Sequence, residues 1–179
     1  MSDAPLGGRA MALPPGLVRA VARGVVAFLA ADAPAIAGLG LAAGVAIATG
    51  HTVVAHGAAV LGLALVANAV HELGHVAAYR VLAPHGRVTL ECGTLMARIR
   101  REPLPRRRDR LVTAAGPLAP LAASVAATPL VTVAPAEVIA GWVLGVAHAV
   151  SLALPTADRR AWRAAGPSPA ERRAPTLGA

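Results

Sequence analysis

Residues 58–82 read AAVLGLALVANAVHELGHVAAYRVL, and this stretch decides how the rest of the chain is interpreted. It is long enough to cross a membrane, because about 20 apolar residues span the hydrocarbon core of a bilayer. Within this apolar run stand His71, Glu72 and His75. A charged group at the centre of a membrane helix costs about 2.5–3.5 kcal/mol on insertion scales, so such groups are rare without a function. The stretch therefore predicts a membrane helix that carries a functional site.

The composition of the whole chain also favours a helical membrane protein. Of its 179 residues, 56% are hydrophobic, but only 2% are aromatic. A soluble core of this size normally relies on large aromatic side chains for its packing area. Here alanine, valine, leucine and glycine supply the apolar content, and small residues let helices approach closely within lipid. A single cysteine, Cys92, excludes an internal disulfide and a CxxC metal pair.

Four apolar stretches predict four membrane-spanning helices, so we expect an all-α polytopic membrane protein with a small cytoplasmic β-hairpin. The predicted spans are residues 34–50, 58–82, 111–133 and 136–155. Residues 1–33 should form a loose N-terminal tail with an interfacial helix at 15–31. Residues 84–110 should form the hairpin and a solvated basic loop. Residues 34–158 then make up one membrane core, followed by a disordered basic tail at 159–179.

The positions of the arginines predict the orientation of the chain. All 17 basic residues are arginines, and the net charge is +8. Except for Arg80 in the second predicted span, they lie before the first span, in residues 84–110 and in the tail, whereas the connections at 51–57, a predicted turn, and 134–136 have none. The positive-inside rule then places both termini and the hairpin in the cytoplasm, at the cell membrane. Because membrane topology explains these arginines, we discount nucleic-acid binding. The arginine-only, alanine-rich composition is typical of a GC-rich bacterial genome.

The segment His71-Glu72-Leu73-Gly74-His75 matches the HExxH pattern of zinc metalloproteases. On a helix the two histidines lie one turn apart and about 40° apart around the axis, so both imidazoles can reach one metal ion. Glu72 lies about 100° from His71, where its carboxylate can deprotonate a metal-bound water without being a ligand. Zinc lowers the pKa of such a water to about 7, and Glu72 can pass the proton to the leaving amine. The pattern predicts Zn²⁺ as cofactor, His71 and His75 as ligands, and Glu72 as the catalytic base.

A catalytic zinc ion usually has three protein ligands and a water molecule, so a third ligand is expected among the nine acidic residues. Asp158 follows the cytoplasmic end of the fourth predicted span, at a depth comparable to that of His75. It is therefore the best candidate. His148, nearly three turns earlier on the same span, is the alternative. Asp158 could instead cap a helix or pair with Arg159 or Arg160.

With these residues in place, the chain resembles the site-2 protease family of intramembrane metalloproteases over residues 59–163. The HExxH pattern in a membrane helix is similar to the family's first motif, and a short β-rich segment follows it, as residues 87–100 do here. Residues 115–120, AGPLAP, resemble a second family motif close to AGPLAN. Residues 151–159, SLALPTADR, resemble a third motif close to NxxPxxxLDG, whose aspartate is the third zinc ligand in the family.

The resemblance implies roles for further residues. It implies that Asp158 binds zinc and that Gly116 and Pro117 contribute to substrate binding, where they would let an extended substrate strand approach. The chain also departs from the family pattern, because Pro120 stands in place of the asparagine of the second motif and the third motif lacks its asparagine. In the family these asparagines are associated with holding the substrate backbone or the oxyanion. The departures concern substrate handling rather than metal binding.

We therefore expect an intramembrane zinc metalloendopeptidase that hydrolyses peptide bonds of membrane-spanning or membrane-associated substrates. Its expected partners are a membrane protein or peptide substrate and the lipid bilayer. The main alternative is a catalytically inactive pseudoprotease that acts as a membrane binding or chaperone protein, which the missing asparagines motivate. A subunit whose buried histidines and glutamate relay protons is a third hypothesis.

Overall fold

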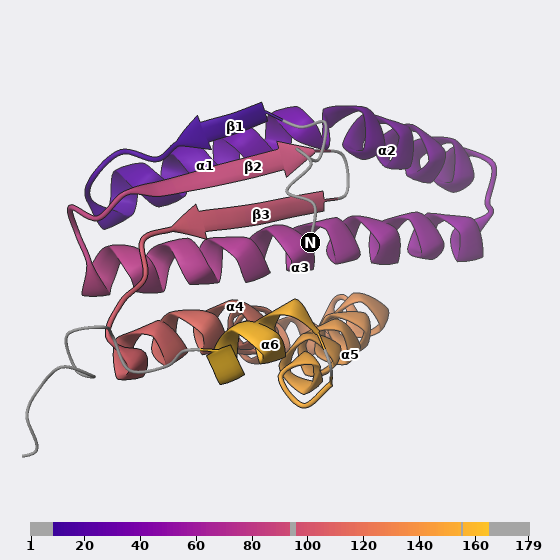
Figure 1. Cartoon of the computed structure of the whole chain (residues 1–179). Coiled ribbons are helices and arrows are strands. Elements are labelled where there is room, and N and C mark those ends of the chain that lie inside the picture. The colour runs from indigo at the N-terminus through magenta and orange to yellow at the C-terminus, as the bar shows by residue number, and fades with distance from the viewer. Residues whose placement is uncertain (1–8, 94–95, 155, 165–179) are drawn as a thin grey trace, which may run out of the picture.

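A computed structural model describes residues 9–93, 96–154 and 156–164 of the chain (Figure 1). Its elements in chain order are β1 (Arg9–Ala12), α1 (Leu17–Ala31), α2 (Ala33–Ala48), α3 (Thr52–Leu82), β2 (Val88–Gly93), β3 (Met96–Arg101), α4 (Arg106–Ala127), the 3-10 helix η1 (Thr128–Thr132), α5 (Pro135–Ser151) and α6 (Ala157–Ala164). The described chain is mainly helical, with one small sheet. Most of the predicted basic tail, residues 165–179, lies outside the described residues.

Two helices in the described chain are long and apolar enough to cross a membrane. They are α3, with 31 residues, and the stretch of α4 and η1, with 27 residues. Helices α1 and α2 pass the same test only as a pair, and they are bent by 64° at Asp32. Pro34 in the first turn of α2 explains the bend, because it has no N–H group for the Ala30 carbonyl and its ring would clash with that carbonyl in a continuous helix. Helix α5 is apolar but has only 17 residues. Two or three helices thus have spanning length, and a fourth span stays a prediction.

The long helices expose the apolar surface that a membrane protein presents to lipid. Only 6% of the most apolar window of α3 is buried within the protein. Large apolar side chains stand outward along the helices, among them Leu41 on α2, Val53 on α3 and Ile139 on α5, each more than half exposed. A soluble monomer rarely exposes contiguous apolar surface on this scale. The exposure is consistent with a membrane protein.

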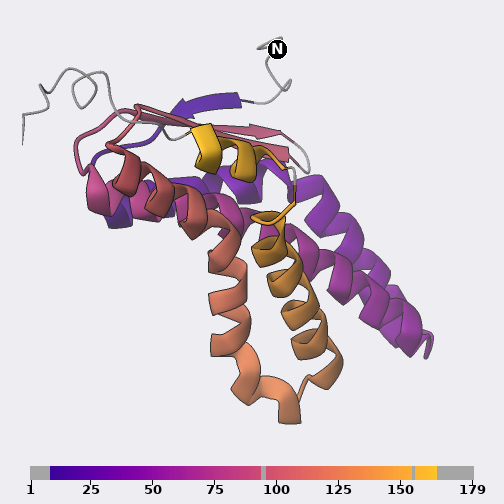
Figure 2. The ribbon, with the colours of Figure 1, turned by 60° about the horizontal axis from the view of Figure 1, so that its bottom comes forward.

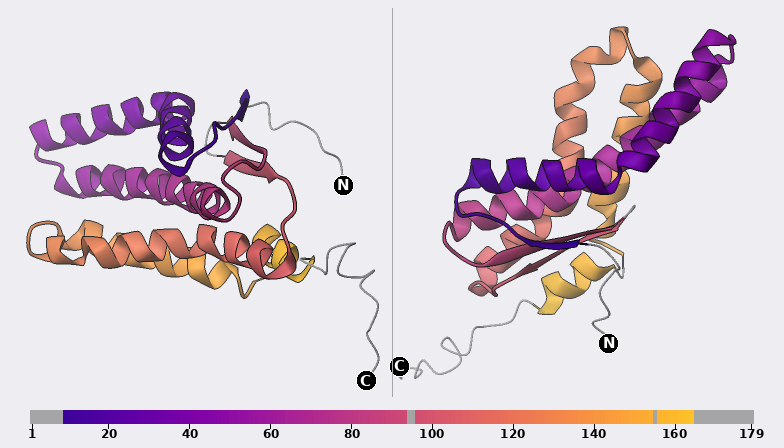
Figure 3. Two further views of the ribbon diagram at one scale, coloured as in Figure 1. Left: turned by 90° about the vertical axis from the view of Figure 1, so that its left-hand side faces the viewer. Right: turned by 90° about the horizontal axis from the view of Figure 1, so that it is seen from above.

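The helices form two arms that extend from a common base (Figure 2). One arm pairs α2 with the N-terminal half of α3, and the other pairs the C-terminal half of α4 with α5. The base holds the sheet, α1, α6 and the remaining halves of α3 and α4, and Figure 3 shows the same division from two further directions. The HELGH segment lies in the part of α3 that belongs to the base.

The sheet has three strands in the order β1-β2-β3, and both neighbouring pairs are antiparallel. The predicted hairpin corresponds to β2 and β3. The N-terminal tail, predicted to be loose, instead contributes β1, and the Leu13 amide extends the pairing to the Val88 carbonyl at 3.0 Å. A four-residue strand carries too little alternation to be recognised in the sequence, and its pairing depends on a distant partner.

The core of the base lies between the sheet and the helices. Alternate side chains of β2 point inward, and Leu90 is almost fully buried among Val76 and Tyr79 of α3 and Phe28 of α1. The guanidinium of Arg80, 3% exposed, donates hydrogen bonds to the carbonyl oxygens of Leu13 and Gly86 at 2.7 Å and of Pro84 at 3.2 Å. These bonds compensate for burying the charge. They fix the N-terminal strand and the α3–β2 turn to the end of α3.

Small residues bring the helices of the second arm together. A Cβ on Gly145 of α5 would lie 2.9 Å from the Leu121 Cα of α4, so the two backbones approach closely there. The Ser124 hydroxyl of α4 donates a hydrogen bond to the Gly141 carbonyl of α5 at 2.7 Å. The loop between the arm's helices is the short stretch around η1.

Two segments that were predicted to be irregular are helical in the structure. A turn was predicted at 51–57, but α3 already begins at Thr52. The chain reverses at Gly50 and His51, where Gly50 has the left-handed conformation with φ 77°. The basic loop predicted at 100–110 ends at Pro105, and α4 begins at Arg106. The Asp109 carboxylate in this first turn accepts a hydrogen bond from the Leu104 amide at 3.2 Å.

Candidate metal centre

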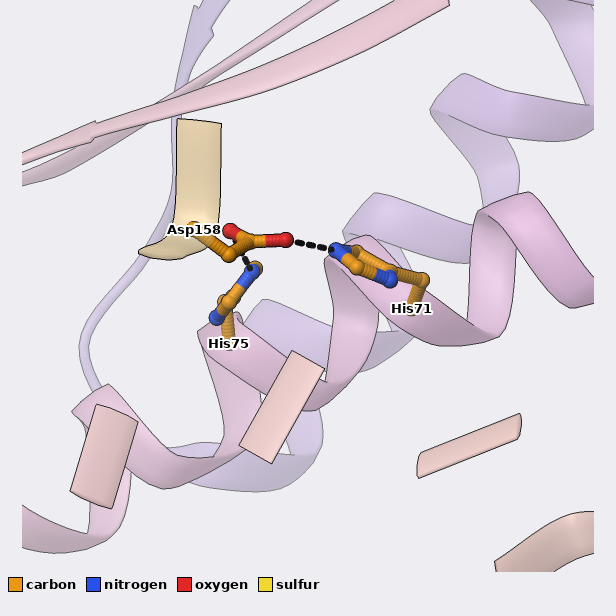
Figure 4. Close-up of side chains that lie close together, drawn as sticks. All are labelled: His71, His75 and Asp158. Carbon is orange, nitrogen blue, oxygen red and sulfur yellow. Dashed lines mark ion pairs between the residues drawn. The ribbon is translucent and has the colours of Figure 1, made fainter. Parts of the chain in front are cut away.

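Three predicted ligands meet where the start of α6 approaches α3. Figure 4 shows the imidazoles of His71 and His75 pointing from α3 toward the carboxylate of Asp158 on α6. The Nε2 atom of His71 is 3.3 Å from Oδ2 of Asp158, and Nε2 of His75 is 3.4 Å from Oδ1. The ligand atoms of these residues lie within 4.8 Å of one another, and no other such group of His, Cys, Asp and Glu occurs among the described residues. The group could hold a metal ion.

The spacing and the donor atoms fit a tetrahedral divalent ion. Two ligand atoms bound at about 2.0–2.1 Å to a tetrahedral ion lie about 3.3 Å apart, which is close to both histidine–aspartate separations. Two imidazole nitrogens and one carboxylate oxygen form a typical catalytic zinc donor set, which leaves a fourth position for water or substrate. The same donors also suit other first-row divalent ions. The geometry therefore defines a metal-binding group without naming its metal.

Contacts with the end of α5 fix the start of α6, and so the position of Asp158. The Thr156 hydroxyl donates a hydrogen bond to the Ser151 carbonyl at 2.8 Å and accepts one from the Arg159 amide at 3.3 Å. The Arg159 guanidinium donates to the Ala153 carbonyl in the same turn. Arg159 thus bonds to the carbonyls that directly follow α5 instead of pairing with Asp158, whose carboxylate stays directed at the histidines.

A cation–π contact holds α6 further along its length. The guanidinium carbon of Arg110 on α4 lies 5.4 Å from the centroid of the Trp162 ring. The prediction of a disordered tail from residue 159 is therefore wrong for residues 159–164. Arginine-rich, weakly hydrophobic sequence favours disorder, but here one aromatic side chain and the contacts of Arg159 dock a short helix.

The carboxyl of Asp158 is anionic in the absence of a metal. Burial by itself raises the pKa of this carboxyl, but hydrogen bonds and charge interactions with His71 and His75 outweigh burial and hold the pKa well below its usual range. The carboxylate is the form that binds a metal ion.

His75 is seated by helix α4. Its Nδ1 atom donates a hydrogen bond to the Val112 carbonyl at 2.7 Å, which leaves Nε2 as the ring atom that is directed at the site and could bind a metal ion. A Cβ on Gly116 would collide with the Nε2, Cε1 and Cδ2 atoms of the His75 ring. Gly74 lets the backbones of α3 and α4 approach closely, because a Cβ added there would lie 2.6 Å from the Ala115 carbonyl oxygen. Two glycines thus let α3 and α4 approach closely enough to hold this imidazole.

Gly116 and Pro117, the predicted substrate-binding residues, are both buried in the middle of α4. They lie ten and eleven residues after the start of α4 at Arg106. Gly116 contacts a ligand directly, a role that the sequence did not indicate. The part of both residues in substrate binding stays a prediction.

Glu72 and His148 lie beside the ligand group but are not members of it. Glu72 interacts electrostatically with His75 and Asp158, so its carboxylate is near the site. The ring centroid of His148 on α5 is 5.2 Å from that of His71. Of the two candidates for the third ligand, only Asp158 therefore places a ligand atom in the group.

Asn68 was not among the predicted site residues. It is the only asparagine of the chain, which has no glutamine. On the α3 helical wheel it lies about 60° from His71, between the directions of His75 and Glu72. Its half-buried side chain makes no hydrogen bond to any described residue. Asn68 could have been predicted as a site residue, because its unpaired carboxamide stands in an apolar helix on the same face as the metal ligands.

An apolar cavity of about 260 Å³ lies between α3, α4 and α5. It adjoins the site at Val70 and Leu144, which neighbour His71 and His148 in the helices, and it is lined further out by Leu63 and Val138. At the far end of the arms, His56 Nδ1 of α3 lies 2.8 Å from the Glu137 carboxylate of α5. The cavity therefore leads from the space between the arms toward the metal-binding group.

Three comparisons with known proteins found no match. No protein-family model, curated protein or solved structure matches the chain. The interpretation of the site rests on its own residues.

Proposed function

We propose that the chain is a zinc-dependent endopeptidase that hydrolyses peptide bonds of membrane-spanning or membrane-associated substrates. The observation that carries the proposal is the group of His71, His75 and Asp158, with Glu72 beside it but outside the ligand set. A closed structural zinc site would use four protein ligands, whereas three protein ligands leave one position for chemistry. The site lies on a helix of membrane-spanning length, which favours a substrate within or beside the bilayer.

Glu72 is proposed to be the general base. A bound zinc ion would acidify water and polarise the substrate carbonyl. The Glu72 carboxylate takes the proton from the attacking water and delivers it to the nitrogen of the leaving amine as the C–N bond breaks. His75 and Asp158 hold their positions through Val112 and α6 and transfer no proton.

An extended substrate segment is needed, because a helix hides its own carbonyls from attack. Pro117 and Pro120 lie inside α4 and have no N–H group, so the carbonyls of Thr113 and Gly116 lack their helical donors. These oxygens are suited to accept hydrogen bonds from a substrate backbone. The outer edge of β3 is a second candidate, because β3 is an edge strand of the sheet.

The family motifs that this chain resembles contain asparagines that are missing here. We propose that Asn68 serves in their place. Its carboxamide N–H group can donate a hydrogen bond to the negative charge that develops on the substrate carbonyl oxygen. Its place on the α3 face of His75 and Glu72 supports this role.

The orientation is also proposed. The sheet, α6 and the arginine-rich start of α4 all belong to the base, from which the apolar arms extend (Figure 2). We place this base at the cytoplasmic side of the cell membrane, as the positive-inside rule favours.

The Glu72→Gln variant tests the proposal. The substrate is a set of quenched fluorescent peptides, each with one apolar span, in the micelles that hold the purified chain. Wild type with Zn²⁺ should cleave members of the set, a chelator should stop cleavage, and Zn²⁺ should restore it. Cleavage in ¹⁸O-labelled water should place one ¹⁸O in the new carboxyl group. Glu72→Gln should retain zinc and cleave about 100-fold more slowly or worse, because general-base catalysis is lost.

Zinc-loaded wild type that cleaves none of the peptides, or a Glu72→Gln variant as active as wild type, would contradict the endopeptidase. The first result would favour the pseudoprotease, whose supporting observation is Pro120 in place of the motif asparagine.

Replacing Asn68 by leucine should lower kcat by about 100-fold while zinc content stays unchanged, because one donor to the developing oxyanion is removed. KM should change little if the bond forms mainly in the transition state. Asn68→Gln, which keeps the carboxamide, should recover part of the rate. An unchanged kcat in Asn68→Leu would exclude the residue from the reaction.

A further inference from the structure

His71 contains a buried nitrogen that has no partner. Its Nε2 atom faces Asp158, whereas its Nδ1 atom is buried and makes no hydrogen bond with any described residue. The residue as a whole is only 9% exposed. A histidine that binds a metal through Nε2 carries its hydrogen on Nδ1, and this N–H group almost always donates to a carboxylate, a carbonyl or water. His71 therefore needs an acceptor on the side away from Asp158.

The neighbouring rings differ in what they can offer. His75 has no free nitrogen, because its Nδ1 donates to the Val112 carbonyl and its Nε2 faces Asp158. His148 has one, because its Nδ1 lies 2.9 Å from the Leu144 carbonyl. A carbonyl oxygen can only accept, so Nδ1 of His148 carries the hydrogen and its Nε2 keeps a lone pair. His148 thus brings an acceptor close to His71, whose Nδ1–H group would otherwise lack one.

The distance between the rings suits a hydrogen bond. A nearly linear N–H···N bond of about 2.9 Å places the centroids of two imidazoles roughly 5 Å apart. The centroids of His71 and His148 are 5.2 Å apart, with the ring planes tilted by 53°. The separation of the rings therefore matches that of a hydrogen-bonded pair, and the proposed bond requires that the rings reorient until Nδ1 of His71 faces Nε2 of His148.

We propose that His148 is the positioning residue for His71, and that its Nε2 atom accepts a hydrogen bond from Nδ1–H of His71 when a metal ion holds the His71 ring. The inference rests on the metal binding of the proposed function and adds α5 to the metal centre. The bond fixes the tautomer of His71 and makes its Nε2 a stronger donor to the metal. Contacts from other helices then hold all three ligands. Helix α5 holds His71, α4 holds His75, and both helices hold α6 with Asp158.

Zinc affinity, measured in the purified full chain by competition with a chromophoric chelator, tests the proposal without any substrate. His148→Leu removes the acceptor and should weaken zinc binding about 10- to 100-fold, the usual effect of losing an outer-shell partner. In His148→Gln the amide oxygen can stand near the position of Nε2, so the affinity should return to within about threefold of wild type. His56→Leu, far from the site on the same helix as His71, is the matched control and should bind as wild type does.

Cobalt(II) absorption distinguishes the positioning role from direct ligation. If His148 acts through His71, the cobalt spectrum of His148→Gln should keep the wild-type band positions, because the ligand set is unchanged. Wild-type zinc affinity in His148→Leu would overturn the proposal. So would a His148→Gln variant that binds as weakly as His148→Leu and has a shifted cobalt spectrum, which would make His148 a ligand. A wild-type chain without zinc affinity would overturn both this proposal and the proposed function, whereas a chain that binds zinc but cleaves nothing would overturn the function alone.

Discussion

The Asp158→Ala variant should lose nearly all bound zinc, whereas the wild-type chain should hold about one ion after gentle purification in detergent. The carboxylate lies 3.3–3.4 Å from the Nε2 atoms of His71 and His75, so it completes the set of three ligands. Zinc sites with four protein ligands bind with about 10–16 kcal/mol, so each ligand accounts for roughly 3–4 kcal/mol. We therefore expect the affinity to fall on the order of 1000-fold.

Zinc per chain is measured by elemental analysis of the purified variant. Glu102→Ala is the matched control, because Glu102 is an acidic residue that pairs with Arg87 at the surface. It should keep the wild-type zinc content. If Asp158→Ala retains zinc at wild-type affinity, the carboxylate is not a ligand, and His148 becomes the leading candidate for the third position.

The second large effect is expected at a residue that supplies no metal ligand. Gly116→Ala should remove zinc from the chain although all three ligands are intact. The added methyl group would occupy the space of the His75 imidazole, so either the ring turns out of the site or α4 moves away from α3. Overpacking of this kind costs typically about 1–3 kcal/mol of stability. If the ring turns out, a ligand is lost and the zinc affinity should fall about 100-fold or more.

Gly44→Ala on α2 separates this effect from any general effect of glycine in a membrane helix. A Cβ at Gly44 meets no atom within 4 Å, so this variant should keep both zinc and thermal stability. Gly116→Ala should also lower the thermal midpoint of the metal-free chain. Wild-type zinc affinity in Gly116→Ala would show that His75 does not lie against α4 as described.

Sequence patterns that act locally predicted the centre of this protein well. The apolar run with HELGH predicted the helix that carries His71 and His75, because helical spacing alone places both rings on one face. Asp158 was found by exclusion among few acidic residues and by the resemblance to the third family motif. The alternation in residues 87–100 predicted β2 and β3, because strand pairing across a short turn is a local property.

The remaining features depend on contacts between distant segments. The strand β1 is too short to be recognised without its partner β2. The Val112 carbonyl is a backbone group that exists at every residue, so no sequence pattern could mark it as the partner of His75. The role of Gly116 follows only from the crossing of α3 and α4. Most of helix α6 was predicted to be disordered, because its composition is that of a solvated tail. The stabilising contact of Trp162 is with Arg110, which lies far away in the sequence.

The place of Asp158 in the chain has a consequence for biosynthesis. In the described part of the chain, helix α6 follows the helices of spanning length, so a growing chain presents both histidines and Glu72 long before the ribosome has made the third ligand. Such an incomplete chain has two of its three metal ligands and holds zinc weakly. On the proposed mechanism, the enzyme is therefore inactive while it is being inserted, and neighbouring nascent membrane proteins are safe from it. On the same mechanism, the synthesis and docking of α6 supply the missing carboxylate and complete the site.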